Sequence, residues 1–221
     1  MIDNCLAKQR CALCQGLCPG ALCAGCEQSL PWNTPACPGC ARMQTHDAPC
    51  ATCAKEPPIF DRAWAALKME TPARDSIHRL KYHAGFLQAH WLGTLMAQRL
   101  AMRAEPLPQL LIPVPLHHTR LMRRGYNQAQ ELARVMTRSL AITLAPHAAQ
   151  RVRATPDQIG QTRAQRRKNL HAAFVVNECV QGAHIALLDD VMTTGATLTE
   201  LAHAARKAGA AKIEVWAAAR A

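Results

Sequence analysis

The chain has 221 residues, of which 49% are hydrophobic, enough to bury a core of ordinary size. No apolar run approaches the roughly 18 residues of a membrane-spanning helix, and the N-terminus lacks the apolar segment of a signal peptide, so we expect a soluble, cytoplasmic protein with no membrane span. The formal net charge of +11 favours polyanionic partners, either nucleic acid or polyphosphorylated small molecules, with a merely solubilising basic surface as the alternative.

Cysteines dominate the start of the chain, where ten of the eleven lie before residue 54. Eight of them form four C-x-x-C units, each of which presents two thiolates from one tight turn and so suits tetrahedral zinc, with a redox-active pair as the alternative. We expect one or two structural Zn²⁺ ions. The simplest grouping places Cys11, Cys14, Cys23 and Cys26 around one ion and Cys37, Cys40, Cys50 and Cys53 around the other, although an interleaved grouping is equally compatible with the sequence.

A change of composition at Pro57 and Pro58 predicts a domain boundary, because residues rich in Cys, Pro and Gly give way to Ala, Leu and Arg. We expect a zinc-ribbon domain over 1–57 and a larger domain over 58–221. The first 60 residues carry four Lys or Arg and four Asp or Glu, so the excess positive charge belongs to the larger domain. A neutral zinc ribbon is expected to contact a protein, or its own neighbouring domain, rather than nucleic acid.

Helices and strands alternate after the boundary. A helix is expected to start at Thr71–Pro72, because proline suits the first helical position. Strands separated by helices predict a parallel sheet flanked by helices, an α/β fold. The further expected elements are helices over 86–103, 126–140 and 196–208, and strands over 110–114, 184–188 and 212–219.

Two acidic residues and a loop of small residues follow the strand predicted over 184–188. Asp189 and Asp190, the candidate catalytic residues, can accept charge-assisted hydrogen bonds from vicinal ribose hydroxyls. The loop leads into a helix N-terminus, where free backbone N–H groups accommodate phosphate. A solvated acidic pair beside an ordinary capped helix is the alternative, but all these features in one register favour a ribose-phosphate site. The candidate phosphate-binding residues are Thr193, Thr194, Gly195, Ala196 and Thr197.

The stretch IALLDDVMTTGATL, Ile185 to Leu198, resembles the ribose-phosphate signature of type I phosphoribosyltransferases. The resemblance extends across nearly the whole chain and is closer to one branch of these proteins, the ComF family, which includes proteins named GntX. Members of this branch carry paired cysteines in front of the signature. The similar segments are IHRLKYHAG (77–85), IPVPLHHTRLMRRGYNQA (112–129) and RATPDQIGQTRAQRRKNLHAAF (153–174). The resemblance implies a type I phosphoribosyltransferase-like sheet behind a small zinc ribbon, with the ribose on the acidic pair and the 5-phosphate on the loop after it.

Two basic segments have two interpretations each. Arg120, Arg123 and Arg124 follow the strand predicted over 110–114, in a loop where the resemblance places diphosphate; an exposed helical charge run is the alternative. The stretch over 151–168 matches the loop that closes over the site in type I enzymes, yet its cations suit a DNA backbone equally well. Its candidate phosphate-binding residues are Arg163, Arg166, Arg167 and Lys168.

The resemblance implies binding of 5-phosphoribosyl diphosphate with Mg²⁺ and a role in DNA uptake during natural transformation. Phosphoribosyl transfer to an acceptor that the sequence does not identify is one interpretation. The other is a non-enzymatic module that senses nucleotides or binds single-stranded DNA, partnering a translocation helicase or another protein through the zinc ribbon. Two Tyr, three Phe and four Trp argue against an extended base-stacking platform and leave attraction to the DNA backbone intact.

Overall fold

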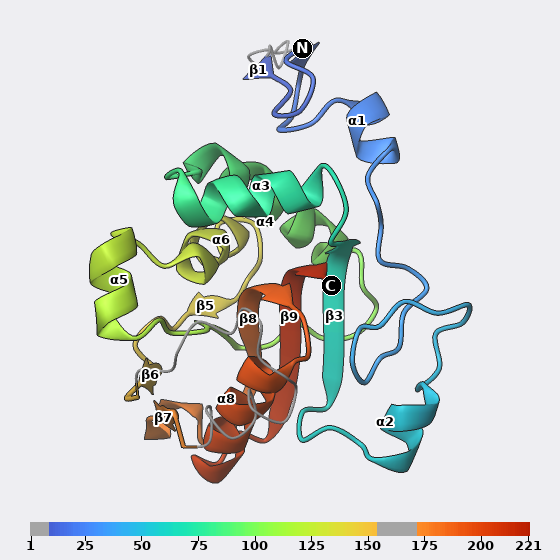
Figure 1. The fold of residues 1–221 in the computed structure, drawn as a ribbon. Coiled ribbons are helices and arrows are strands. Elements are labelled where there is room, and N and C mark those ends of the chain that lie inside the picture. Colours follow the sequence, from blue (N-terminus) through green and yellow to red (C-terminus); the bar gives the residue numbers. More distant parts are fainter. Residues whose placement is uncertain (1–8, 154–171) are drawn as a thin grey trace, which may run out of the picture.

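A computed structural model describes residues 9–153 and 172–221 (Figure 1). Within these ranges the main feature is a parallel sheet of five strands in the order β3-β9-β8-β4-β5. The two central strands, β8 and β9, are buried along most of their length, which is typical of parallel sheets covered on both faces. The strands are β3 (Arg62–Lys68), β4 (Leu110–Pro113), β5 (Thr143–Leu144), β8 (His184–Met192) and β9 (Lys212–Arg220).

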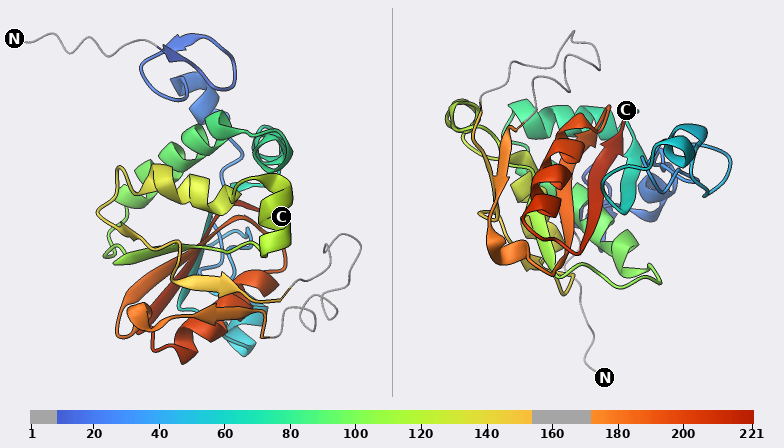
Figure 2. Two further views of the ribbon diagram at one scale, coloured as in Figure 1. Left: turned by 90° about the vertical axis from the view of Figure 1, so that its left-hand side faces the viewer. Right: turned by 90° about the horizontal axis from the view of Figure 1, so that it is seen from below.

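Helices cover both faces of this sheet, as the left view of Figure 2 shows. One buried cluster joins α3 (Ala73–Tyr82), α4 (Phe86–Ala101) and α6 (Gln128–Met136) to the sheet face that carries Leu188 and Trp216. The other joins α8 (Ala196–Lys207) to the opposite face. Gly93 lets α4 approach α6 closely, because a Cβ there would meet Cβ of Val135 at 2.8 Å. The expected α/β arrangement of a parallel sheet flanked by helices is confirmed.

The described elements depart from the sequence-based expectations in several places. The segment after β4 was expected to be a loop, and this is wrong: it forms the helix α5 (His118–Arg124), which ends at Gly125 with a φ of 83°. α6 is shorter than expected at both ends: it begins after Asn127, whose side chain caps it by accepting from the Ala129 N–H at 3.0 Å, and it ends at Met136 rather than at Leu140. The unexpected elements are β3, β5, the antiparallel pair β6 (Ala149–Arg151) and β7 (Phe174–Val176), and the 3₁₀ turn η1 (Glu178–Val180).

Strand β8 also runs farther than expected, through Met192 rather than Leu188. Its register with β9 continues to the pair Met192 and Arg220, so the neighbouring strand supplies hydrogen-bonding partners beyond the apolar run. Asp189 and Asp190 therefore lie near the end of a strand instead of in the loop that follows it. Adjacent residues of a strand point to opposite faces, so the two carboxyl groups have different surroundings.

The cysteine-rich segment contacts the sheet edge. It contains β1 (Gln9–Arg10) paired with β2 (Leu17–Cys18), then the short helices α1 (Ala24–Gln28) and α2 (Ala51–Lys55). Between these helices the chain runs beside β3: the Lys68 N–H donates to the Pro31 carbonyl at 2.8 Å, and the Ala63 N–H donates to that of Pro38 at 2.7 Å. The segment thereby covers polar groups that an edge strand would otherwise expose.

No helix in the described part of the chain is both long enough and apolar enough to cross a membrane.

Candidate functional site

The acidic pair lies at the carboxyl end of β8. Asp190 is 3% exposed, and its Oδ2 lies 3.0 Å from Nζ of Lys81 in the last turn of α3. Asp189 is partly exposed, and its Oδ1 accepts the backbone N–H of Asp190 at 2.9 Å. The ammonium of Lys81 thus holds a buried carboxylate, and a second carboxyl group lies next to it. Both lie at the carboxyl ends of the strands, where ligands of parallel sheets bind.

Burial and the neighbouring carboxylate set the protonation of Asp189. Burial and the charge of Asp190 raise the pKa of Asp189 to about 8, although Lys81 partly opposes the shift. For Lys81, burial by itself would lower the pKa, but the attraction of Asp190 and Asp189 outweighs burial and the pKa is raised. At neutral pH the Asp189 carboxyl therefore tends to keep its proton and can donate a hydrogen bond, whereas Lys81 stays charged. A cation that binds Asp189 displaces that proton.

The loop over 193–197 follows the acidic pair and leads into α8. Gly195 has a φ of 78°, a left-handed conformation that favours glycine, and an added Cβ would meet Cε of Met192 at 2.9 Å. The Thr194 hydroxyl accepts the Ala196 N–H at 3.3 Å. Because the first N–H groups of a helix lack intrahelical acceptors, this junction presents donors and the positive end of the α8 dipole next to Asp189. The expected order of strand, acidic pair, loop and helix is present.

The three arginines expected to bind diphosphate lie on α5, not on a loop. Arg124 Nη1 donates to Oε1 of Gln128 at 2.6 Å, and its positive charge opposes the rise in the pKa of Lys81. Burial and the charge of Arg120 lower the pKa of Arg151 in β6, while the charge of Asp189 partly opposes this shift. Positive charge therefore flanks the acidic pair from two elements. Arg123 is exposed. Arg163, Arg166, Arg167 and Lys168 lie outside the described residues.

Lys81 is a site residue that the sequence-based interpretation did not single out. It lies four positions after the buried Ile77 and one after the buried Leu80, so it belongs to the edge of the helix face that packs on the sheet. A cation on such a face signals a buried anionic partner, because an unpaired charge there is costly. That pattern could have marked Lys81 as a candidate, but it does not identify Asp190 as its partner.

The cysteines form two separate groups, each with its thiol sulfurs within 4.8 Å of one another. Four sulfurs about 2.3 Å from a tetrahedral ion would lie about 3.8 Å apart. The distances are 3.7 Å between Sγ of Cys14 and Cys23, and 3.8 Å between Sγ of Cys40 and Cys50. The consecutive grouping is therefore the one present among the described cysteines: the first unit is Cys11, Cys14, Cys23 and Cys26, and the second unit is Cys37, Cys40, Cys50 and Cys53.

Backbone N–H groups support thiolate formation in both units. The Cys23 N–H donates to Sγ of Cys11 at 3.4 Å, and the Cys50 N–H donates to Sγ of Cys37 at 3.2 Å. The backbone N–H of Cys53 is the main cause that lowers the pKa of Cys50 to about 6. Four converging thiols with such support suit a structural Zn²⁺ ion, with all four positions of the coordination sphere supplied by the protein.

Comparison with known proteins adds independent information. No model of a protein family matches the chain. The chain is 36% identical over 223 residues to competence protein F of Haemophilus influenzae, an alignment that covers 96% of this chain and 97% of that protein. Over 200 residues it is 32% identical to the DNA utilization protein YhgH of Salmonella typhi and 33% identical to that of Escherichia coli strain K12, each covering 88% of both chains.

Two solved structures show partial similarity to the chain. The glutamine phosphoribosylpyrophosphate amidotransferase of B. subtilis, complexed with ADP and GMP, is 16% identical with a TM-score of 0.41, covering 65% of this chain and 30% of that chain. A glutamic acid mutant from the analysis of an invariant aspartic acid in HPRTs is 13% identical with a TM-score of 0.33, covering 67% of this chain and 78% of that chain.

Proposed function

Since the chain belongs to the ComF family, with competence protein F and the DNA utilization protein YhgH as relatives, we propose that it binds 5-phosphoribosyl diphosphate together with Mg²⁺ and acts in DNA uptake. The observation that carries the proposal is the continuous arrangement from the Lys81–Asp190 ion pair, through Asp189, to the 193–197 loop and the start of α8. It combines hydroxyl acceptors with phosphate donors at one sheet edge, as a sugar phosphate requires.

The proposed contacts follow from the chemistry of each group. Asp189 and Asp190 accept the ribose hydroxyls, while Lys81 holds the Asp190 carboxylate in place. The N–H groups and threonine hydroxyls of the 193–197 loop donate to the 5-phosphate. Arg120 and Arg124 approach from α5 on the side where the diphosphate would lie, and guanidinium groups suit its oxygens because they donate bidentately and keep their charge. A bound Mg²⁺ ion would neutralise part of the negative charge of the diphosphate.

Transferase activity is a further part of the proposal. An acceptor that attacks the anomeric carbon would displace diphosphate, and the arginines of α5 would stabilise the negative charge that grows on it. The acceptor is unidentified, so the activity is measured as diphosphate release that depends on an added base or nucleotide. Binding is tested first, because it does not require the acceptor.

We expect calorimetric titration of 5-phosphoribosyl diphosphate with Mg²⁺ to show binding to the zinc-loaded wild type, and at least about 100-fold weaker binding to Asp189→Asn/Asp190→Asn. Two charge-assisted hydrogen-bond acceptors are lost, each contributing about 1.5–3 kcal/mol. Wild-type affinity should also strengthen between pH 6 and pH 8, because Asp189, with its pKa of about 8, must lose its proton to accept charge-assisted hydrogen bonds from the ribose hydroxyls.

The matched control is Glu178→Gln, which removes an exposed carboxylate from η1 outside the site and should bind like the wild type. The absence of binding to folded, zinc-loaded wild type would refute the proposal. Equal affinity in the double variant would show that any binding occurs elsewhere.

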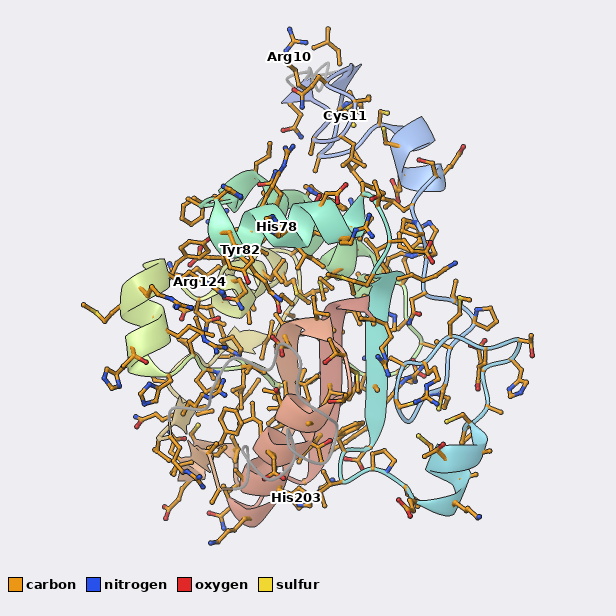
Figure 3. The ribbon with its side chains drawn as sticks, in the orientation of Figure 1. Arg10, Cys11, His78, Tyr82, Arg124 and His203 are labelled. Carbon is orange, nitrogen blue, oxygen red and sulfur yellow. The ribbon has the colours of Figure 1, made fainter. Side chains whose placement is uncertain are left out.

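A second candidate function, binding of a single strand of DNA, is favoured by an aromatic platform made of Tyr82, Phe86 and Tyr126. Tyr82 is 59% and Phe86 is 54% exposed, and the Phe86 and Tyr126 ring centroids lie 5.4 Å apart. The guanidinium carbon of Arg124 lies 5.5 Å from the Tyr82 ring centroid, and Figure 3 shows these two residues facing each other between α3 and α5. The chain has few aromatic residues, but the fold gathers both tyrosines beside a cation. That combination suits base stacking next to a phosphate.

We expect Tyr82→Ala/Phe86→Ala to weaken binding of a fluorescent oligothymidylate at low salt by about 30-fold or more, since stacking contributes about 1–3 kcal/mol per base. Anisotropy titrations would measure it. The slope of affinity against salt should stay unchanged, because the phosphate contacts remain. Leu87→Ala, which shortens a neighbouring exposed apolar side chain without a π face, is the control. Equal losses in both variants, or no binding by the wild type at low salt, would rule out a stacking platform.

A further inference from the structure

The second cysteine unit is joined to the start of the 193–197 loop by one side chain, that of Arg220 at the end of β9. Nε of Arg220 donates to the Cys40 carbonyl at 3.0 Å. Nη1 of the same guanidinium donates to the Met192 carbonyl at 2.9 Å and to the Thr193 carbonyl. The same Nη1 also donates to the carbonyl of Ala221. A planar guanidinium holds its donors in a fixed fork, so the carbonyls of the cysteine segment and of the start of the loop are placed relative to one another.

On the cysteine side, the backbone around Cys40 is itself fixed. Ala41 is fully buried with a φ of 53°, and its N–H donates to the Cys37 carbonyl at 2.8 Å. The Ala41 carbonyl accepts Nδ2 of Asn33 at 2.9 Å. Ala41 and Met192 belong to the same buried cluster. Since the Cys37 and Cys40 thiols belong to the second unit, a metal ion there would determine where the Cys40 carbonyl lies.

On the loop side, the guanidinium holds the Thr193 carbonyl and shares the Met192 carbonyl with the Ala221 N–H, which donates to it at 3.1 Å. In a trans peptide the C=O and the following N–H point in opposite directions. With the Met192 and Thr193 carbonyls directed at Arg220, the N–H groups of Thr193 and Thr194 are directed away from it. These are among the donors that the proposed function assigns to the 5-phosphate. Rotation of either plane would turn a carbonyl oxygen toward the anion and repel it.

We propose that Arg220 is a positioning residue that couples metal occupancy of the second cysteine unit to phosphate binding at the 193–197 loop. The phosphate part of this inference rests on the proposed function, whereas the link between the metal and the loop conformation does not. The first cysteine unit lies above α3, away from β9 (Figure 1), so the coupling is specific to the second unit. Because coupling between two sites is reciprocal, a bound phosphate ligand must also retain the metal of the second unit.

The first measurement is amide hydrogen exchange of the full-length, zinc-loaded chain, which needs no ligand. We expect Arg220→Gln to keep its zinc, by metal analysis, and to raise at least tenfold the exchange rates of two hydrogen-bonded amides at the loop. These are the amide of Ala196, which donates to Oγ1 of Thr194 at 3.3 Å, and that of Ala221, which donates to the Met192 carbonyl at 3.1 Å. Arg220→Lys, which keeps the charge without the planar fork, should recover only part of the protection. Arg206→Gln is the matched control: Arg206 also donates to backbone carbonyls, those of Ala210 and Ala211, but at the other end of the sheet.

The second measurement is metal transfer to a chromogenic chelator with and without saturating 5-phosphoribosyl diphosphate and Mg²⁺. In the wild type the ligand should slow metal loss from the second unit at least tenfold and leave the first unit unaffected. Cys14→Ser/Cys26→Ser, which disrupts the first unit, should retain this protection. Arg220→Gln should lose it, together with at least a tenfold loss in ligand affinity.

The outcomes separate this inference from the proposed function. If the wild type binds the ligand but Arg220→Gln shows wild-type exchange and affinity, the coupling is refuted and the proposed function stands. If the wild type does not bind the ligand, the proposed function fails, and hydrogen exchange alone decides whether Arg220 links the metal unit to the loop. Equal effects in Arg206→Gln would refute a specific role for Arg220.

Discussion

Removal of metal from the zinc-loaded protein is expected to unfold the two cysteine units while the five-stranded sheet stays folded. Helices α1 and α2 have five residues each, too short to be stable alone, and neither contains a buried residue. The metal would therefore supply most of the folding free energy of these units, for which structural zinc sites contribute about 10–16 kcal/mol in apparent binding free energy.

Limited trypsin digestion measures this unfolding. After chelation, cleavage should accelerate at least about 100-fold at Arg42, which lies between Cys40 and Cys50, and at Lys55, which follows Cys53, with the zinc-loaded protein as reference. Far-UV circular dichroism should keep the signal of the sheet and its helices. Loss of the segment that covers β3 should also promote aggregation, because an uncovered edge strand pairs with other chains.

The control for this experiment is Cys179→Ser, which removes an exposed thiol outside both units and should not change the metal content. Unchanged digestion of a protein shown by metal analysis to have lost its zinc would contradict the prediction. It would mean that the contacts of the segment with β3 suffice to fold these units.

A second large effect is expected from Arg103→Met, because it would leave a buried carboxylate without its main partner. Glu214 in β9 is 1% exposed, and it accepts two hydrogen bonds of 2.7 Å from Nη1 and Nη2 of Arg103. Nε1 of Trp216 donates to it at 3.0 Å, and Nε2 of His184 lies 3.1 Å away. Removing one partner of such a buried pair costs about 3–5 kcal/mol in the free energy of unfolding.

Urea unfolding at pH 7 with excess zinc would measure the loss, and its pH dependence provides a second check. In the wild type, burial raises the pKa of Glu214, but the hydrogen bonds from Arg103 and Trp216 outweigh burial and lower it. This stabilisation is present above the ordinary pKa and is lost as the pH falls through the lowered value. In Arg103→Met, burial without the arginine raises the pKa of the Glu214 carboxyl. Acidification then protonates this carboxyl, so the stability of the variant increases as the pH falls. The difference between the two proteins should narrow from pH 7 to pH 5.

The control is Glu105→Gln, whose carboxylate pairs with Arg62 and lies 3.7 Å from Nε of Arg103, but is 42% exposed. Exposed ion pairs contribute about 0–1 kcal/mol, so this variant should unfold close to the wild type. A loss below about 1 kcal/mol in Arg103→Met, or a difference that widens on acidification, would show that Glu214 does not depend on Arg103.

Local sequence pattern was sufficient to predict the parallel sheet, the acidic pair and the loop after it. Asp189, Asp190 and the residues over 193–197 are nearly consecutive, so one strand, its end and the following helix N-terminus determine their arrangement. The same holds for the pairing of thiols within each C-x-x-C unit. The strand β3 was missed because its alternating Ala and Trp residues give a weak apolar signal. For α5 the prolines before it favour a loop, and the structure shows the alternative, a helical run of charged residues.

The sequence by itself determined which residues are candidates for binding phosphate, ribose hydroxyls and zinc, because such candidates are identified by residue type and short spacing. Only the tertiary structure decided which of them meet. The consecutive grouping of the cysteines, the Lys81–Asp190 pair and the gathering of Tyr82 with Arg124 all join separate elements. Arg220 and Cys40 lie 180 positions apart and meet because β9 ends beside the second cysteine unit. Such contacts depend on how strands and helices pack, and no local pattern in the chain specifies them.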